Sequence, residues 1–186
     1  MATDVVRRRF DVSDYYRMAD AGILRENDRV ELIDGEIIQM SPIGSRHAAR
    51  VTLAEEALRR HLGEAVIVRV QNPVRLDDYS EPEPDIAVVI RRLDRYAQAH
   101  PGPRDILLIL EISDTSSAFD RQVKAPMYAR AGITELWLEL ISEECIEIHT
   151  EPVNGAYNKV RQARRGESLT PQSFPQVSIA VDELLG

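Results

Sequence analysis

The stretch that decides the fold runs from Ile106 to Tyr128 and reads ILLILEISDTSSAFDRQVKAPMY. It begins with an unbroken apolar run from Ile106 to Leu110, which follows Asp105. A short apolar run bounded by polar residues is typical of a strand that is covered on both faces. We therefore predict a central strand here, in a sheet that has helices on each side.

Polar residues follow this apolar run directly. Side chains alternate along a strand, so Glu111 is expected on the same face as Leu107 and Ile109, with Ser113 next on that face. A buried carboxylate is costly unless a cation, a metal ion or several hydrogen bonds receive it. Glu111 is thus a candidate functional residue.

A helix is predicted after the polar loop, with Ser117 as its cap and an end near Gly132. Of the 23 basic residues in the chain, only Lys124 and Lys159 are lysines, and the rest are arginine. A lysine in such a chain suggests a need for its compact ammonium group. Pro126 interrupts the helical hydrogen-bond ladder, which predicts a kink or a late helix start.

Length and composition describe one globular domain, residues 1–186. No run approaches the ~20 apolar residues that span a membrane, and no apolar segment follows the charged N-terminus. The single cysteine, Cys145, excludes an internal disulfide, and we expect a cytoplasmic protein. A net charge of −8 argues against a nucleic-acid coat protein, which binds through many phosphate contacts. This net charge does not exclude an enzyme that binds phosphates through a metal ion and a local basic strip.

The N-terminal part predicts a short helix over residues 11–21, capped by Ser13, and then a hairpin. Two alternating runs in RVELIDGEIIQM are joined by Asp34-Gly35, a strong hairpin signal. Glu31 and Glu36 then project from one face of the hairpin. They are either two solvated acids or contributors to an acidic site.

An amphipathic helix is predicted from Ser45 to Leu62. His47 lies in its first turn, where it is either a surface or capping residue or a functional one. This region is the most basic part of the chain, and its arginines form either a solvated face or a strip that contacts DNA phosphates. The candidates for DNA contact on this helix are Arg46, Arg50, Arg59 and Arg60.

Further strands are predicted on both sides of the central one. The acidic loop DDYSEPEPD leads through Pro84 to Asp85, which stands at the entrance of the apolar strand IAVVI. Residues 91–105 are expected to form a polar helix and a turn. TELWLEL predicts another buried strand, and antiparallel strands that turn at Asn154-Gly155 follow it, with a short C-terminal helix at the end.

Asp85, Glu111 and Lys124 form the candidate site. Two carboxylates from adjacent strands suit a hard divalent cation such as Mg²⁺, with Mn²⁺ as an alternative, and the Ile112 carbonyl could add a ligand. A nearby lysine can orient or help to deprotonate a water and offset charge on a phosphorane-like transition state. The sequence has no P-loop, GxSxG, CxxC or HExxH motif. These residues therefore favour phosphodiester hydrolysis.

The order Pro-Asp, apolar strand, Glu-x-x resembles the PD-(D/E)XK nuclease superfamily. More closely, the chain from Arg29 to Trp137 is similar to the Uma-type family of restriction endonucleases. The similar segments are VELIDGEIIQMSP, the helix that opens with His47, QNPVRL, EPDIAVV and EISDTS…DRQVKAPMYARAGITELW. The resemblance implies a restriction-endonuclease-like α/β fold with a mixed central sheet, in which Asp85 and Glu111 are metal ligands.

The lysine departs from the simple superfamily spacing, because Ser113 occupies the position two residues after Glu111. The family that this chain resembles places its lysine on the following helix, which here is Lys124. The alternative is local: Asp120 and Lys124 stand four residues apart and could form an ordinary surface pair worth about 0.3–0.5 kcal/mol.

The resulting hypothesis is a single-domain, Mg²⁺-dependent endonuclease that cuts DNA. Glu31, Glu36, His47 and Gln71 are its auxiliary candidates. The rival hypothesis is a non-catalytic nucleic-acid-binding or assembly module on the same fold with a vestigial metal site. A homodimer is expected by analogy, because two cuts in a duplex need two sites.

Overall fold

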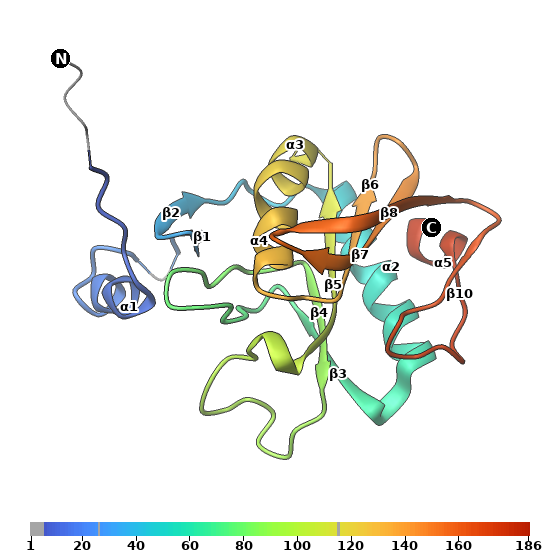
Figure 1. The fold of residues 1–186 in the computed structure, drawn as a ribbon, viewed down its shortest axis with the longest axis horizontal. Helices are drawn as coiled ribbons and strands as arrows, with labels where there is room; N and C mark the ends of the chain where they lie inside the picture. Colours follow the sequence, from blue (N-terminus) through green and yellow to red (C-terminus); the bar gives the residue numbers. More distant parts are fainter. Residues whose placement is uncertain (1–5, 26, 115) are drawn as a thin grey trace.

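The computed structural model describes residues 6–25, 27–114 and 116–186 and shows a mixed α/β fold (Figure 1). Its central feature is a six-stranded sheet in the order β3-β4-β5-β6-β7-β8. The elements are α1 (Val12–Asp20), β1 (Val30–Ile33), β2 (Glu36–Gln39), α2 (Ser45–Leu62), the 3-10 turn η1 (Gly63–Ala65), β3 (Val66–Val70), β4 (Ile86–Ile90), the 3-10 turn η2 (Pro103–Asp105), β5 (Ile106–Ser113), α3 (Ser117–Phe119), the π-turn η3 (Asp120–Lys124), α4 (Ala125–Arg130), β6 (Glu135–Leu140), β7 (Cys145–Val153), β8 (Ala156–Arg164), β9 (Ser168–Leu169), β10 (Ile179–Ala180) and α5 (Val181–Leu185).

The central position predicted for β5 is confirmed. β5 pairs antiparallel with β4 and parallel with β6, so the sheet is mixed. The register between β4 and β5 shifts at Val88/Val89: Val88 faces Leu108, whereas Val89 faces Ile106. Leu107 is the extra residue of this bulge, and it packs on the same core cluster as Leu108. The prediction that Leu107 shares a face with Glu111 is therefore wrong.

Helices cover both faces of the sheet, as predicted. One core cluster joins apolar residues of α2 and α5 to Leu108, Leu110 and Ile112 of β5. The other joins Ile109 to α4 residues, among them Tyr128. Figure 1 shows α4 and α2 on opposite sides of β5. Because the strand alternates between these two cores, it is buried along its length, which accounts for its unbroken apolar run.

The predicted hairpin and the predicted helix over residues 45–62 are both confirmed. Asp34 and Gly35 take φ values of 50° and 78° in the turn, which only a few residue types tolerate. The predictions for the cap of α1 and for a helix after β4 are wrong. Asp11, not Ser13, caps α1, because its carboxylate accepts from the Asp14 N–H at 2.7 Å. Residues 91–102 form turns and bends rather than a helix, and a 3-10 turn follows them.

The helix after β5 changes its winding just before Pro126. α3, η3 and α4 are contiguous in sequence, and η3 is a π-turn that ends at Lys124. Its C-terminal bond runs from the Ala125 N–H to the Asp120 carbonyl. Pro126 has no N–H to donate, so an irregular turn is the expected result. Ser116 occupies the N-cap position in place of Ser117.

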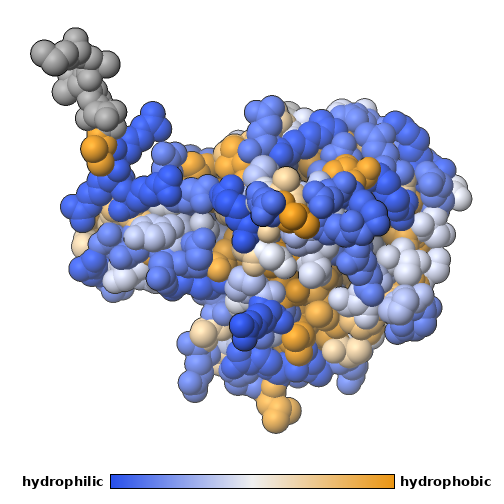
Figure 2. Space-filling model, in the orientation of Figure 1, coloured by the Kyte–Doolittle hydropathy of each residue, from blue (hydrophilic) through white to orange (hydrophobic). Residues whose placement is uncertain are grey.

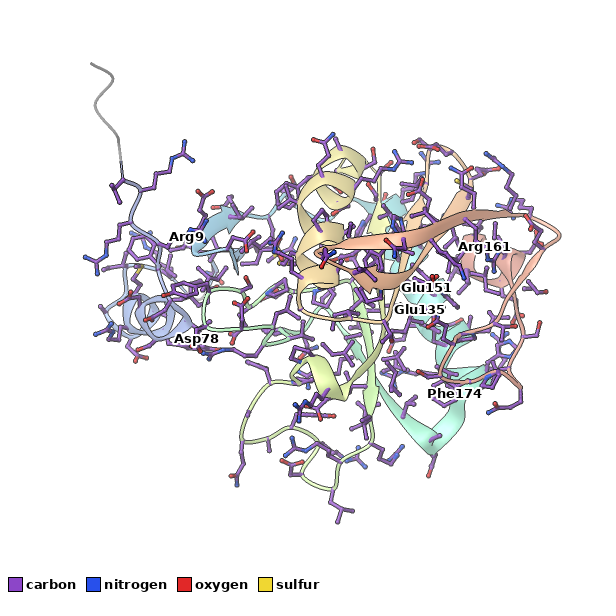
Figure 3. The ribbon with its side chains drawn as sticks, in the orientation of Figure 1. Arg9, Asp78, Glu135, Glu151, Arg161 and Phe174 are labelled. Atoms are coloured by element: carbon purple, nitrogen blue, oxygen red, sulfur yellow. The ribbon has the colours of Figure 1, made fainter. Side chains whose placement is uncertain are left out.

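Hydrophilic residues cover most of the face seen in Figure 2, with smaller apolar patches between them. Charged side chains stand on the β7–β8 hairpin, where Figure 3 labels Glu151 and Arg161. Lys159 lies on β8 with its side chain 69% exposed, and its ammonium pairs with Glu151. Of the two lysines, this one has an ordinary surface environment.

Candidate active site

Asp85 lies at the entrance of β4, where three polar groups surround its carboxylate: the His47 ring, the Gln71 amide and the Ile112 N–H. Its Oδ2 accepts a hydrogen bond from the Ile112 N–H at 2.9 Å. Its Oδ1 is 2.9 Å from Nε2 of His47 and 3.3 Å from the amide Nε2 of Gln71. The hydrogen bond to Asp85 raises the pKa of His47. The structure thus places two of the four auxiliary candidates, His47 and Gln71, against the predicted metal-binding carboxylate.

Gln71 reaches Asp85 through an unusual backbone conformation. Its φ of 48° lies in the left-handed region, which costs a non-glycine residue about 1 kcal/mol or more. The Gln71 N–H donates to the Asp85 carbonyl at 3.0 Å, so main chain and side chain contact the same residue. This strained turn directly follows β3 and fixes the amide beside the carboxylate.

Glu111 stands near the end of β5 and is buried, with 3% exposure. Its Oε1 accepts from the Lys124 ammonium at 3.2 Å and from the Tyr128 hydroxyl at 2.7 Å. Its Oε2 accepts from the Asp85 N–H at 3.3 Å. Burial raises the pKa of Glu111 to about 8, although Lys124 opposes the shift. The carboxylate is therefore fixed on one oxygen and only weakly held on the other.

Lys124 lies inside the protein, not on the helix surface. Its Nζ is 3.2 Å from Glu111 and 3.4 Å from Oε1 of Glu31, and both acids are buried. Burial alone would lower the pKa of Lys124, but the carboxylates of Glu111 and Glu31 outweigh it and raise the pKa. Glu31 is held in turn by the Glu83 N–H at 3.1 Å. Lys124 is therefore a charged ammonium between two acids.

The surface pair of Lys124 with Asp120 is not observed among the described residues. Asp120 is itself buried, and its Oδ2 accepts from the Ser116 hydroxyl at 2.6 Å. Burial raises the pKa of Asp120. Within the π-turn, the side chains of Asp120 and Lys124 do not have the i,i+4 geometry of an α-helix. Lys124 faces β5 and β1 instead.

These groups open into a cavity of about 550 Å³. Carboxylates dominate its polar lining: Glu31, Glu83, Asp85, Glu111, Asp114 and Asp120, against Arg29 and Lys124. Apolar side chains also line it, among them Met40 and Ile43 from the loop between β2 and α2, and Phe119 from α3. The cavity therefore has an acidic part that would repel an anion and an apolar part beside it.

The oxygen atoms at this site fit a hard cation. Asp85 and Glu111 present carboxylates from neighbouring strands, and Ile112 also lines the cavity. Within residues 6–25, 27–114 and 116–186, no group of three His, Cys, Asp or Glu side chains is arranged to hold a metal ion. Mg²⁺ commonly takes one or two carboxylates and keeps water as its other ligands, so this donor set suits it.

Glu36 does not join the site. Its side chain is 59% exposed and lies 3.6 Å from Arg7. The hairpin register pairs Ile33 with Glu36 and Glu31 with Ile38, as predicted. Glu31, however, packs against the body of the protein near Glu81 and Glu83, whereas Glu36 stands at the exposed turn. Of the two interpretations of these acids, the solvated one therefore holds for Glu36 and not for Glu31.

The arginines of α2 do not form a continuous strip of phosphate contacts. Arg50 is buried and lies 3.5 Å from Glu139, itself fully buried. Arg59 and Arg60 bond to Glu55 and Glu183, and they lie ~20 Å along the helix from His47. Arg46 is the exposed one near the cavity, 3.8 Å from Asp114. The structure thus removes Arg50 from the DNA-contact candidates.

Tyr128 is the site residue that the sequence did not indicate. Its side chain is fully buried, and its hydroxyl contacts Glu111 from a position one helical turn beyond Lys124. The spacing of four residues from Lys124 to Tyr128 places both on one helix face. This spacing is the feature of the sequence that could indicate Tyr128 as a site residue.

Comparisons with known proteins show a matching family and similar solved structures. Residues 12–182 match the Uma2 family, described as "Putative restriction endonuclease". The crystal structure of "a putative nuclease belonging to DUF820" from Anabaena variabilis ATCC 29413 is similar, with a TM-score of 0.71 and 15% identity. The alignment covers 95% of this chain and 97% of that one, and it confirms the expected fold. No curated protein matches the sequence. None of the described helices is long and apolar enough to cross a membrane.

Proposed function

Because this chain belongs to the Uma2 family, we propose that it is a Mg²⁺-dependent endonuclease that hydrolyses phosphodiester bonds of DNA. One observation supports this most directly. The carboxylates of Asp85 and Glu111 and the ammonium of Lys124, which come from three separate elements, meet at one cavity. Burying a lysine and several acids together is costly, so the fold maintains an arrangement that local stability would not favour.

Asp85, Glu111 and the Ile112 carbonyl would hold the cation. A bound Mg²⁺ supplies Lewis-acid stabilisation of the phosphoryl oxygens and lowers the pKa of a bound water. The chain's own groups orient these ligands. His47, Gln71 and the Ile112 N–H hold Asp85, whereas Tyr128 holds Oε1 of Glu111. Such supporting contacts keep a site in its productive geometry.

Lys124 acts as a hydrogen-bond donor and a fixed positive charge. The acids beside it favour its protonated form, so it stabilises negative charge rather than accepting a proton from water. Glu31 keeps the ammonium next to Glu111. This role needs a compact cation at one position, which distinguishes it from the general charge of a surface lysine.

The test is cleavage of supercoiled plasmid by purified protein in Mg²⁺ or Mn²⁺. We expect the parent to convert the plasmid to nicked or linear forms, and Glu111→Gln to lose at least ~10²-fold of this rate. The matched control is Glu151→Gln, which changes an exposed acid on the β7–β8 hairpin (Figure 3) and should cut like the parent. Equal rates for Glu111→Gln and the parent would contradict the proposal.

A second candidate function is the non-catalytic binding or assembly module. Two observations favour it: among the described residues, the site has two carboxylates and no group of three acidic, histidine or cysteine ligands, and arginines of α2 form ion pairs within the protein. Calorimetry with Mn²⁺ separates the two functions. An endonuclease site binds the cation and loses it in Asp85→Asn, whereas a vestigial site shows no heat of binding in either protein. The homodimer remains a prediction, which light scattering can test.

A further inference from the structure

We propose that this site acts on unpaired nucleotides, so that its substrate is single-stranded DNA or an unpaired stretch within a duplex. The inference rests on the proposed function and adds the state of the DNA that the cavity accepts. Its starting observation is the juxtaposition of the catalytic carboxylates with apolar side chains that retain accessible surface. Ile43 is 42% exposed and Phe119 is only partly buried, and both line the cavity that holds Asp85 and Glu111.

Nucleobases have the chemistry that this apolar lining would receive. A base offers a flat apolar face, which is covered by its neighbours in a stacked duplex and becomes available when the strand is unpaired. Stacking of one base on an aromatic side chain contributes about 1–3 kcal/mol, and it works for every base. Phe119 with Met40 and Ile43 thus provides a surface for a base next to the diester that is cut.

The charges around the cavity argue against a grip on intact duplex. Proteins that hold a duplex place several lysines or arginines on its phosphates. In the described part of the chain, each of the four arginines of α2 forms an ion pair with an acid of the protein itself, and acidic side chains outnumber basic ones in the cavity lining. A long row of phosphate contacts is therefore not provided here. Recognition has to come from one diester and the base beside it.

The depth of the reacting groups points the same way. Glu111 is 3% exposed and Lys124 is 7% exposed, so a diester has to enter the cavity to reach them. Duplex DNA bends little over a few base pairs, because its persistence length is ~150 base pairs. A single strand can fold its backbone into the cavity and turn a base against the wall.

The experiment compares three labelled oligonucleotides of one sequence: the single strand, the full duplex, and a duplex with a central unpaired loop. With Mg²⁺, we expect the single strand to be cut at least ~10-fold faster than the duplex, and the third substrate to be cut in its loop. Fluorescence anisotropy should give the same order of affinity without turnover. Ile43→Ala and Phe119→Leu should each lower the rate on unpaired DNA by ~5- to 10-fold, in proportion to the lost contact with a base.

Ile90→Ala is the matched control. Ile90 is 43% exposed, close to the value for Ile43, but it ends β4 five residues from Asp85 and is not part of the cavity lining. It should cut like the parent. Preferential cutting of the full duplex would overturn the inference and leave the proposed function intact. Undiminished cutting by both cavity variants would also overturn it. No cutting of any DNA would overturn the proposed function as well.

Discussion

Replacing Lys124 by methionine should destabilise the protein strongly. The ammonium lies 3.2 Å and 3.4 Å from two buried carboxylates. At an effective dielectric constant of about 20, each contact carries ~5 kcal/mol of attraction before desolvation is subtracted. Removing one partner of a buried pair leaves uncompensated charge and costs about 3–5 kcal/mol. For a protein of this size, that corresponds to a fall in Tm of ~6–20 °C.

Because burial raises the pKa of Glu111 to about 8, urea unfolding and thermal melts at pH 9, where Glu111 is ionised and Lys124 is still protonated, measure this effect. The control is Lys159→Met, which removes the exposed lysine and should cost less than about 1 kcal/mol. The double variant Lys124→Met with Glu31→Gln should regain part of the loss, because it removes one of the uncompensated acids. A loss below about 1 kcal/mol for Lys124→Met would refute the reasoning, since it would make Lys124 energetically equivalent to a surface residue.

Three further predictions concern the metal, a positioning contact and the response to acid. Mn²⁺ at 100 times its Kd should stabilise the parent by about 2.7 kcal/mol and raise its Tm by several degrees, whereas Asp85→Asn should show no shift in a thermal melt. Tyr128→Phe removes the 2.7 Å bond to Glu111, so it should cost about 1.5–3 kcal/mol in urea unfolding and lower kcat more than it changes KM; a parent-like kcat would contradict the positioning role. Burial lowers the pKa of His149, although His149 bonds to Glu147; Arg121 and Tyr157 also lie close to this pair. The unfolded chain therefore binds the proton more tightly than the folded one. The free energy of unfolding should fall as the pH drops below 6.5. His149→Gln should lose less stability between pH 7 and 5, by up to about 1.4 kcal/mol per pH unit, and identical slopes in urea unfolding would show that His149 does not contribute.

The features that the sequence predicted correctly depend on local patterns. Asp34-Gly35 specifies a tight turn through backbone angles that few residues tolerate, so the hairpin and its register follow. The helix from Ser45 to Leu62 has a repeating apolar face and ends at Gly63, which has a φ of 58°. The apolar run of β5 indicated its central position because strands covered on both faces need such a run.

The features that it missed depend on partners distant in sequence. The bulge at Leu107 follows from the pairing of β5 with β4, which no pattern within β5 specifies. The burial of Arg50 depends on Glu139 in β6, 89 residues later by their numbers. The polar segment over residues 91–102 packs Tyr96 into the core but has no repeating apolar face, so its composition alone does not distinguish a helix from a series of turns.

The prediction of the site from the sequence is incomplete for the same reason. Asp85, Glu111 and Lys124 stood out through their positions on predicted elements, and the structure brings them together. Glu31 approaches Lys124 across 93 positions of the chain, a contact set by how the hairpin packs on the sheet. Tertiary packing therefore determines that Glu31 joins the site and Glu36 does not. The alternation of side chains along the strands cannot distinguish the two.

Cleavage by the two lysine-to-arginine variants tests the central claim most directly. Both changes keep the positive charge, and Lys124 and Lys159 are the only lysines in the chain. We predict that Lys159→Arg nicks plasmid in Mg²⁺ like the parent, because its exposed pair with Glu151 needs only charge. Lys124→Arg should lose at least ~10²-fold of the rate, because the wider guanidinium cannot occupy the place of the ammonium beside Glu111. Parent-like cutting by Lys124→Arg would contradict the account.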